Sequence, residues 1–476
     1  MPVRACVLLL LLASTLAGCA ASGSEDSDPK ADGGADSSDV RVGTDGYDYG
    51  PPPRVAGREL AQATVASLDV LVRAFALNGE IDKRALDAAS RSSDARLGWL
   101  ISDLLRFAGS REAERELVDA FERVTQTRVR RDPAFAQSAW LSVTNHLISW
   151  DLPAAPGYRA LKATVFTAVE PGWQPFFDDP RSAIDWRLIS WGGVQIDDRP
   201  AGDRDPCPRG CIPALDDPEL TNATRGSWYP DDRVVFGVIE RGDAVAFPKN
   251  IMEVHEMVNI TIGGRRLGIP YCTLCGSAQA YFTDRVRGRD KPLLLRTSGL
   301  LSRSNKVMYD RSTQSVLNTF SGEALSGPLH EDRIKLDQTS VTVSTWGEWK
   351  REHPRTKIVA QDGGLDRDYD LDPLGKRDDN GPIFPIGRAD PRLPVHEQIL
   401  GVDVPGQKPL AFVVAQARAE LASGRKVASG DVEVVSDGAG LQARRKDGRE
   451  LTTHQAFWFA WSQFHPDTEL WNPLSR

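Results

Sequence analysis

The sequence predicts an α+β fold, with an all-helical domain near the N-terminus followed by a larger, mainly β domain with irregular loops. From about residue 55 to residue 150, apolar side chains recur at helical spacing, as in Leu68, Leu71, Val72 and Phe75. After Pro153 the chain changes to short β-branched runs separated by proline and glycine. With 476 residues the chain also exceeds one simple core, so more than one domain is expected.

The helical domain is assigned to residues 55–152. Three positions within it favour helix starts. Asp82 precedes one apolar run, Ser110 precedes another with acidic residues in its first turn, and Asp132 stands before a proline. We therefore expect four helices packed in antiparallel pairs.

The mainly β domain is assigned to residues 153–476, and two hairpins are its clearest elements. Strands 234–239 and 245–247 flank a turn at Arg241-Gly242-Asp243. Strands 258–262 and 267–269 flank Gly263-Gly264, which supplies the positive φ of a tight primed turn. The other elements expected are strands at 278–282, 293–296, 307–309 and 341–344, a short helix at 346–352 and a long surface loop at 362–394.

The first 18 residues have the pattern of an export signal, with Arg4 before an apolar run at 7–12. The run ends at Leu16-Ala17-Gly18-Cys19, which resembles the lipobox of bacterial lipoproteins. That resemblance implies cleavage before Cys19 and attachment of lipid to it. Ala20 follows, which by resemblance to lipoprotein sorting favours the outer membrane.

Residues 19–54 are rich in Ser, Asp, Gly and Ala and predict a disordered tether. The protein is therefore expected in the bacterial cell envelope, held to a membrane through lipid on Cys19 and facing the periplasm or the cell surface. The formal net charge of −8 supplies no broad positive field, so nucleic acid is not expected as a partner. Protein partners are not indicated by the sequence.

The six cysteines of the chain divide into an N-terminal pair and four others. Without Cys6, which leaves with the signal, and with lipid on Cys19, the remaining four are Cys207, Cys211, Cys272 and Cys275. Outside the cytoplasm disulfides are the default state of such thiols. Cys207 and Cys211 enclose three residues that include Pro208 and Gly210, which favours a local disulfide; a metal role or reactive thiols are the alternatives.

Cys272 and Cys275 form a Cys-x-x-Cys pair followed by Gly276. A strand-like run follows, and not the long helix that a thioredoxin-type pair uses to activate its thiolate. The pair resembles one knuckle of a zinc ribbon or rubredoxin, so a soft-metal site is the leading interpretation. Histidines would have to complete it: His255 first, because the second hairpin carries it towards the cysteines, and His465 second.

The metal would be copper or zinc. The thioethers of Met257 and Met308 would favour copper beside thiolate and imidazole, although core packing also accounts for both methionines. Glu256 could orient the His255 ring or move protons.

Five segments carry a resemblance to a known family: 254–259, 271–278, 298–300 with 305–311, 346–349 and 458–466. Taken in order, they resemble the prokaryotic family known as domain of unknown function 3179. The resemblance covers roughly residues 200–470. Thr273 stands where proline is commoner in the family, and Ser277 where threonine is. The family's activity is unassigned, but the resemblance implies one shared site of His255, Cys272, Cys275, Asn305, Asp310, Arg311 and His465.

Two other functions stay open on the sequence. Cys272 and Cys275 could cycle between dithiol and disulfide, with His255 activating one thiol. Alternatively, the chain could be a binding module for an envelope carbohydrate or another ligand, with both cysteine pairs as inert bridges. The aromatic pocket of such a module would use Trp346, Trp349, Trp458 and Trp461, which core packing also explains.

Overall fold

The structure, a computed structural model, describes residues 47–473 except 56, 58, 206, 208 and 376–381. The chain from Arg41 onward forms one compact unit. The predicted export signal, the lipobox and most of the predicted tether lie outside the described residues. No helix among the residues described is both long and apolar enough to span a membrane.

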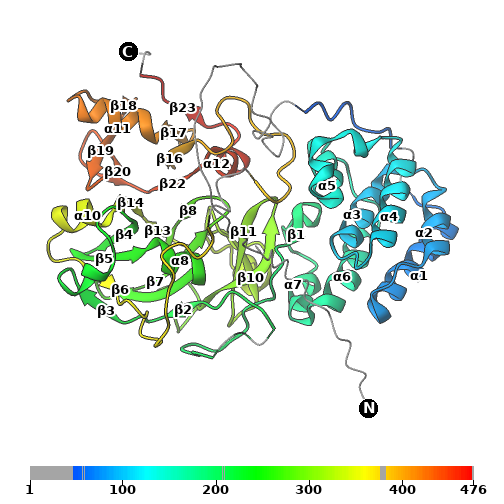
Figure 1. Ribbon diagram of the computed structural model, residues 1–476, viewed down its shortest axis with the longest axis horizontal. Coiled ribbons are helices and arrows are strands. Elements are labelled where there is room, and N and C mark those ends of the chain that lie inside the picture. Colours follow the sequence, from blue (N-terminus) through cyan, green and yellow to red (C-terminus); the bar gives the residue numbers. More distant parts are fainter. Residues whose placement is uncertain are drawn as a thin grey trace, which may run out of the picture. The chain divides into compact units, whose positions relative to one another are not determined.

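Helices occupy the first part of the described chain (Figure 1). Two predicted helix starts are confirmed, because Asp82 accepts a hydrogen bond from the Ala85 N–H and Ser110 accepts one from the Ala113 N–H. The third, Asp132, caps only a short 3₁₀ turn. The α-helices are α1 (Gln62–Asn78), α2 (Lys83–Ser90), α3 (Gly98–Arg106), α4 (Arg111–Thr125), α5 (Ala139–Ser149), α6 (Tyr158–Val169) and α7 (Gln174–Asp178). The 3₁₀ turns are η1 (Ala95–Leu97), η2 (Val129–Arg131), η3 (Pro133–Ala136), η4 (Pro171–Trp173), η5 (Trp186–Leu188) and, in the β part, η6 (Arg225–Trp228).

The helical part continues past residue 152, the boundary expected from the sequence. α6 and α7 follow it, and α6 packs against α1 and α3. The change in composition after Pro153 predicted β structure from that point. Pro153 lies only in the connection before α6, and Gly157, at φ 78°, turns the chain into that helix.

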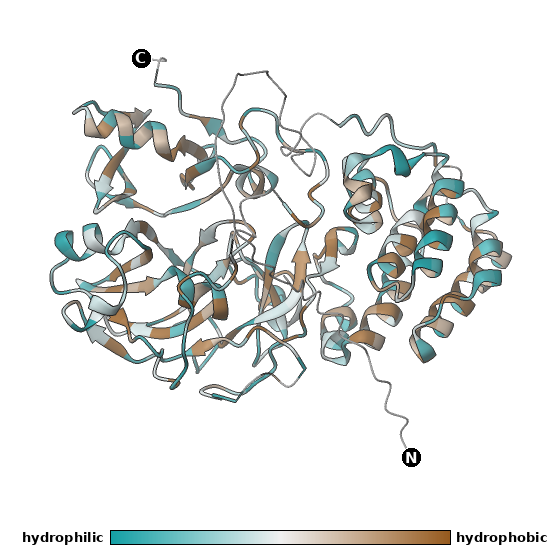
Figure 2. Cartoon of the chain, viewed as in Figure 1, coloured by the Kyte–Doolittle hydropathy of each residue, from teal (hydrophilic) through white to brown (hydrophobic). Residues whose placement is uncertain are grey.

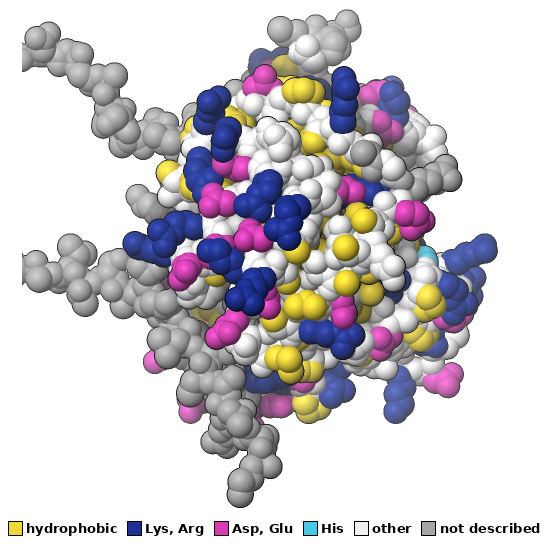
Figure 3. All heavy atoms as spheres, turned by 90° about the vertical axis from the view of Figure 1, so that its right-hand side faces the viewer, with side chains coloured by type: hydrophobic (Ala, Val, Ile, Leu, Met, Phe, Trp, Pro, Cys, Tyr) yellow, Lys and Arg dark blue, Asp and Glu magenta, His cyan; other side chains and the backbone are white. Residues whose placement is uncertain are grey.

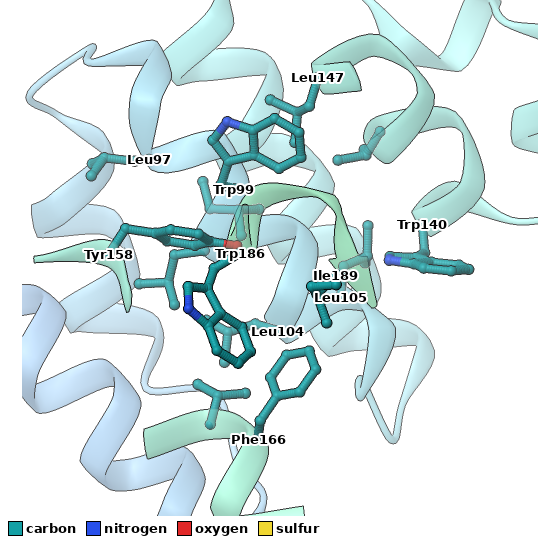
Figure 4. Packing of buried hydrophobic residues seen from close by; sticks show 14 of the residues in the cluster. Leu97, Trp99, Leu104, Leu105, Trp140, Leu147, Tyr158, Phe166, Trp186 and Ile189 are labelled. Carbon is teal, nitrogen blue, oxygen red and sulfur yellow. The ribbon is translucent and has the colours of Figure 1, made fainter. Parts of the chain in front are cut away.

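The helices share an apolar core with the first sheet. Trp99 of α3, Phe166 of α6 and Trp186 lie close together in Figure 4, and the same cluster includes Leu300 and Val307 from the β part. The helices are therefore packed onto the sheet rather than linked to it by a free tether. Figure 2 shows the apolar stripes of the helices in brown.

The outer face of the helical part mixes charges of both signs (Figure 3). Arg73 lies 2.8 Å from Asp69 on α1, and Lys83 lies 2.7 Å from Glu116 of α4. Exposed pairs of this kind contribute little stability, about 0–1 kcal/mol each. Because the paired charges have opposite signs, the described residues of this face set up no broad electrostatic field of one sign.

The rest of the chain forms five small sheets in a β-propeller-like arrangement, so the fold is α+β as predicted. The first contains β1 (Ile189–Trp191), β10 (Leu295–Ser302), β11 (Asn305–Asp310) and β12 (Ser315–Asn318). The second contains β2 (Leu215–Asp216), β6 (Met257–Ile262), β7 (Arg265–Cys272), β8 (Ser277–Ala278), β9 (Ala280–Phe282) and β13 (Gln338–Thr339).

The third sheet contains β3 (Leu220–Asn222), β4 (Val234–Glu240), β5 (Asp243–Pro248), β14 (Thr342–Thr345) and β15 (Lys357–Val359). The fourth contains β16 (Gln398–Val402), β17 (Leu410–Val413), β22 (Thr453–Phe457) and β23 (Glu469–Leu470). The fifth contains β18 (Val427–Ser429), β19 (Val432–Asp437), β20 (Gly440–Arg445) and β21 (Glu450–Leu451). Short helices connect these strands: α8 (Lys249–His255), α9 (Gly327–Glu331), α10 (Trp346–Glu352), α11 (Val414–Ala422) and α12 (Trp458–Phe464).

Both predicted hairpins are present. β4 pairs with β5 around Arg241 and Gly242, and β6 pairs with β7 around Gly263 and Gly264. The two glycines have φ of 56° and 75°, the left-handed conformation that a primed turn requires.

The third and fourth sheets are two copies of one unit. Each copy has a hairpin, β4–β5 or β16–β17, and a strand, β14 or β22, that pairs with the first hairpin strand. A helix that begins with tryptophan follows, α10 or α12. The final strand, β15 or β23, then pairs in parallel with the second hairpin strand.

The side chains that hold each copy together also repeat. Trp349 Nε1 donates to Thr356 Oγ1 at 2.9 Å, and Trp461 Nε1 donates to Thr468 Oγ1 at 3.0 Å. Each indole is thereby fixed to the turn before the final strand. The printed sequence shows the pattern as W-x-x-W-x-x-x-H-P-x-T, starting at Trp346 and at Trp458.

A glycine lies against each of these indoles. A Cβ on Gly237 would lie 2.3 Å from the Trp349 ring, and one on Gly401 would lie 2.1 Å from the Trp461 ring. The equivalent strand position in both copies must therefore lack a side chain. The apolar cores of the β part form on this scaffold.

Candidate functional site

Cys272 and Cys275 are joined as a disulfide across the turn between β7 and β8, with their Cα atoms 5.2 Å apart. Both side chains are buried, Cys272 at 2% exposure and Cys275 at 0%. The Cys275 carbonyl accepts a hydrogen bond of 2.8 Å from the Phe457 N–H at the end of β22. The cystine therefore lies where the second and fourth sheets meet.

Asn305 faces the cystine from the start of β11. Its Oδ1 lies 3.2 Å from Cys275 Sγ, and its Nδ2 donates to Gln463 Oε1 at 3.0 Å. Gln463 Nε2 in turn donates to the Ile386 carbonyl at 3.3 Å. Because that bond fixes the orientation of the Gln463 amide, the oxygen of Asn305, and not its NH₂, is directed at the sulfur.

A buried ion pair lies on the other side of the cystine loop. Lys306 Nζ lies 2.8 Å from Glu256 Oε2 and donates to the Glu256 carbonyl at 2.9 Å. Thr273, inside the loop, donates to Glu256 Oε1 at 3.2 Å. Burial lowers the pKa of Lys306, and the negative charge of Glu256 opposes this shift.

The candidate site thus brings together Cys272, Cys275, Asn305 and Glu256 of the predicted residues. Lys306 and Gln463 complete it and were not predicted. A lysine inside a strand whose residues are otherwise mostly apolar was the available signal for Lys306, since a charge at such a position needs a partner. Gln463 lies 158 residues from Asn305, and no local pattern in the sequence links the two.

His255 lies next to Glu256 in the chain, but its side chain is directed elsewhere. Its Nδ1 donates to the Pro213 carbonyl at 2.7 Å, and its Nε2 accepts from the Tyr369 hydroxyl at 2.6 Å. Glu256, at φ 51°, ends α8 in the left-handed conformation, so the two neighbouring side chains diverge. The predicted proximity of backbones holds, because the Tyr271 N–H donates to the Glu256 carbonyl at 2.9 Å.

His255 lines a different cavity, of about 380 Å³, together with Arg199, Asp216 and Arg367. Burial lowers the pKa of His255 to about 4, from an ordinary value of 6.5. Both ring nitrogens are used within the protein, so the ring is a neutral structural element of the cavity wall.

Replacing His255 with glutamine should flatten the pH dependence of stability. The folded pKa lies below the unfolded one, so the unfolded state binds the proton first and stability falls as the pH drops from about 6.5 towards about 4. Between pH 7 and pH 5 this single group contributes a loss of about 2 kcal/mol. Chemical unfolding of both proteins at the two pH values measures the difference; parallel pH profiles would contradict the assignment.

His465 packs on a tryptophan ring in the same way as His353, the residue at the same position in the other copy of the repeat. Its ring centroid lies 4.0 Å from that of Trp461, as the His353 ring lies 4.1 Å from Trp349. His353 belongs to the copy of the repeat that has no cystine. The turn that both copies share therefore explains the conformation of His465.

Asp310 and Arg311 lie at the far end of β11 from Asn305. Asp310 accepts hydrogen bonds from the N–H groups of Leu294 and Thr313, each at 2.8 Å, and so holds the turn after the strand. Arg311 donates to the Asp198 carbonyl at 2.8 Å. The structure therefore separates both residues from the cystine, because a strand of six residues spans about 17 Å.

Cys207 and Cys211 are at disulfide distance, in agreement with the predicted local bridge. With Asp197 they form the group of His, Cys, Asp or Glu side chains that the described residues bring close enough to share a metal ion. The bridge occupies both sulfurs, and Asp197 lies 2.7 Å from Arg199 Nε. The predicted ligands Cys272, Cys275, His255 and His465 form no such group within the described residues, so copper or zinc at that place stays a prediction.

The four tryptophans considered for a carbohydrate pocket are buried, each at 1% exposure or less. Their indole N–H groups donate within the protein, to Gly226, Thr356, Asp390 and Thr468. None presents an open face to a planar ligand, and core packing accounts for all four.

Comparison with known proteins identifies one family, described as protein of unknown function (DUF3179), which matches residues 209–448. That range contains the cystine, Asn305, Lys306 and Glu256, and it ends before Gln463. No curated protein and no solved structure matches the chain. With a match over half of its 476 residues, the chain belongs to the DUF3179 family of proteins of unknown function.

Proposed function

We propose that the protein is a lipid-anchored thiol–disulfide redox protein of the bacterial cell envelope, with Cys272 and Cys275 as the redox pair. The observation that carries this proposal is the Asn305 oxygen 3.2 Å from Cys275 Sγ. A disulfide sulfur has no proton to give to that oxygen, whereas a Cys275 thiol would donate to it. The site thus holds an acceptor that only its reduced state can use.

The proposed reaction needs an external dithiol as reductant. One of its thiolates attacks the Cys272 sulfur, the less buried of the two, and a new S–S bond forms as the Cys272–Cys275 bond breaks. The released Cys275 thiolate takes a proton from water and donates to Asn305. The second thiolate of the reductant then displaces Cys272, and the reductant leaves as a disulfide.

The lipid anchor on Cys19 belongs to the same proposal and rests on the lipobox. An extracytoplasmic position keeps thiols oxidised unless a dedicated dithiol supplies electrons. The disulfide state of both cysteine pairs is compatible with that position.

The test is a redox titration of the full chain with Cys207 and Cys211 replaced by serine. Thiols at Cys272 and Cys275 are trapped and counted by mass after equilibration in dithiol buffers. We expect reversible reduction with a potential above about −300 mV, the value below which structural disulfides usually fall. A lower potential, or no reduction without unfolding, would show a structural bridge. Stoichiometric copper or zinc on the reduced protein, lost in Cys272→Ser, would replace the redox proposal with a metal site.

Asn305→Ala should make the potential more negative. The variant removes the acceptor for the Cys275 thiol and so destabilises the reduced state by about 0.5–1.5 kcal/mol, which corresponds to about 10–30 mV. Asn222→Ala, an exposed site on β3, is the control. An unchanged potential would remove the main support for the proposal.

A further inference from the structure

A cavity of about 650 Å³ lies where the end of α5, the segment 386–392 and α12 come together. This volume is within the range of small-molecule sites. Its apolar walls include Ile148, Ile386 and Phe459. Three arginines also line it: Arg303, Arg388 and Arg392.

One of these arginines is neutralised. Arg392 binds Asp390 through two contacts, Nε to Oδ1 at 3.0 Å and Nη2 to Oδ2 at 2.6 Å. This bidentate geometry satisfies the carboxylate that lines the cavity. Asp390 is therefore not available as a counter-ion for the other two arginines.

Arg303 and Arg388 have no carboxylate within ion-pair distance among the residues that the structure describes. Arg303 donates to the Gln463 carbonyl at 2.9 Å and lies over the Phe464 ring at 5.5 Å, and its Nε is buried without a hydrogen-bond partner. Burial lowers the pKa of Arg303, and the negative charge of Asp185 opposes this shift. Asp185 is itself paired with Arg187 at 2.6 Å, so a bound anion would offset much of the cost of burying the Arg303 charge.

A fourth arginine, Arg106, adds to the positive potential from inside the protein. A second, very small cavity is lined by Arg106 and, from the side of the larger one, by Arg303 and Ile148. The Arg106 guanidinium lies 4.4 Å from the Trp140 ring and 5.2 Å from the Trp191 ring, and it too has no carboxylate partner among the described residues. This second cavity, of about 10 Å³, has room for one water at most, so a ligand must occupy the larger one.

We propose that the 650 Å³ cavity binds a small organic anion, a carboxylate or a phosphate monoester with an apolar portion. The anionic group contacts the guanidinium groups of Arg303 and Arg388, and the apolar portion packs on Ile148, Ile386 and Phe459. Guanidinium groups suit both anions because their N–H donors match the spacing of two oxygens. The inference does not depend on the redox chemistry of the cystine.

Three related probes separate charge from apolar contact: phenyl phosphate, inorganic phosphate and phenol. Calorimetric titration of the full chain should show binding of phenyl phosphate, binding of inorganic phosphate at least tenfold weaker, and no binding of phenol. Benzoate in place of phenyl phosphate decides between carboxylate and phosphate monoester. Phenol binding as tightly as phenyl phosphate, or no binding of either organic anion at about 10 mM, would overturn the proposal.

Variants locate the site. Arg303→Gln and Arg388→Gln should each weaken phenyl phosphate binding at least tenfold, and Arg303→Lys should retain part of the affinity because it keeps the charge. Arg388 is exposed, so its variant tests the site without disturbing the core. Arg73→Gln, on the surface of α1 and paired with Asp69, is the control and should bind like the wild type. Equal affinity in the wild type and in Arg388→Gln and Arg303→Gln would contradict the assignment.

Discussion

Replacing Asp103 with leucine is expected to lower the free energy of unfolding by about 3–5 kcal/mol, the cost of leaving a buried charge without its partner. Asp103 Oδ1 lies 2.6 Å from Lys162 Nζ, whose side chain has no exposure, and Asp103 Oδ2 accepts from the Tyr158 hydroxyl at 2.8 Å. Burial lowers the pKa of Lys162, and the charge of Asp103 opposes this shift. Without Asp103 the amine keeps only the Ile189 carbonyl at 2.7 Å and the Tyr158 hydroxyl at 3.1 Å.

The double variant Asp103→Leu, Lys162→Met is the matched control. Apolar groups of similar volume in place of both partners leave no unpaired charge, so most of the lost stability should return. Unfolding in urea, followed by tryptophan fluorescence, measures all three proteins. Equal loss in the single and double variants would mean that the shape of the site, and not the unpaired lysine, determines stability.

Replacing Trp461 with alanine should cost about 3–5 kcal/mol and also expose the cystine to reductant. The Trp461 side chain packs in the same apolar cluster as Cys272 and Cys275, whereas Trp349, its counterpart in the repeat, packs in a different cluster. Removal of either indole leaves a cavity beside a strand glycine. Only the cavity left by Trp461 would lie in the apolar cluster that contains the disulfide.

Comparing Trp461→Ala with Trp349→Ala therefore separates the loss of folding stability from the access of a reductant to the disulfide. Both variants should lose similar stability in urea. Only Trp461→Ala should speed the reduction of the cystine by a dithiol under native conditions. The same rate in both variants would show that the reductant reaches the sulfurs through global unfolding.

Local patterns predicted most elements of the fold. Cap residues such as Asp82 and the Gly263-Gly264 turn act within a few residues, so the sequence near them was sufficient. The extension of the helical part through α6 was not predicted, because the chain becomes rich in proline and glycine after Pro153. The repeat could have been found in the sequence, since its W-x-x-W-x-x-x-H-P-x-T pattern occurs twice.

The site was predicted in part. Cys272, Cys275 and Glu256 meet because the β6–β7 hairpin, which the sequence shows, determines their backbone positions. Asn305 lies outside that hairpin, on β11, and only the family resemblance pointed to it. The direction of the His255 side chain depends on the left-handed conformation of Glu256, and no residue type at that position signals it. Gln463 reaches Asn305 only because α12, which follows β22 of the fourth sheet, lies against β11 of the first sheet, and that is a property of the whole fold.

The internal repeat has a consequence for choosing a fragment to produce. The family match ends at residue 448, before β22, α12 and β23. A chain cut there would keep the hairpin β16–β17 but lose both neighbouring strands, which pair with it through residues 453–457 and 469–470. Two unpaired strand edges and an uncovered Gly401 would promote association between molecules. The segment that the family match covers is therefore shorter than the set of strands that completes the fourth sheet.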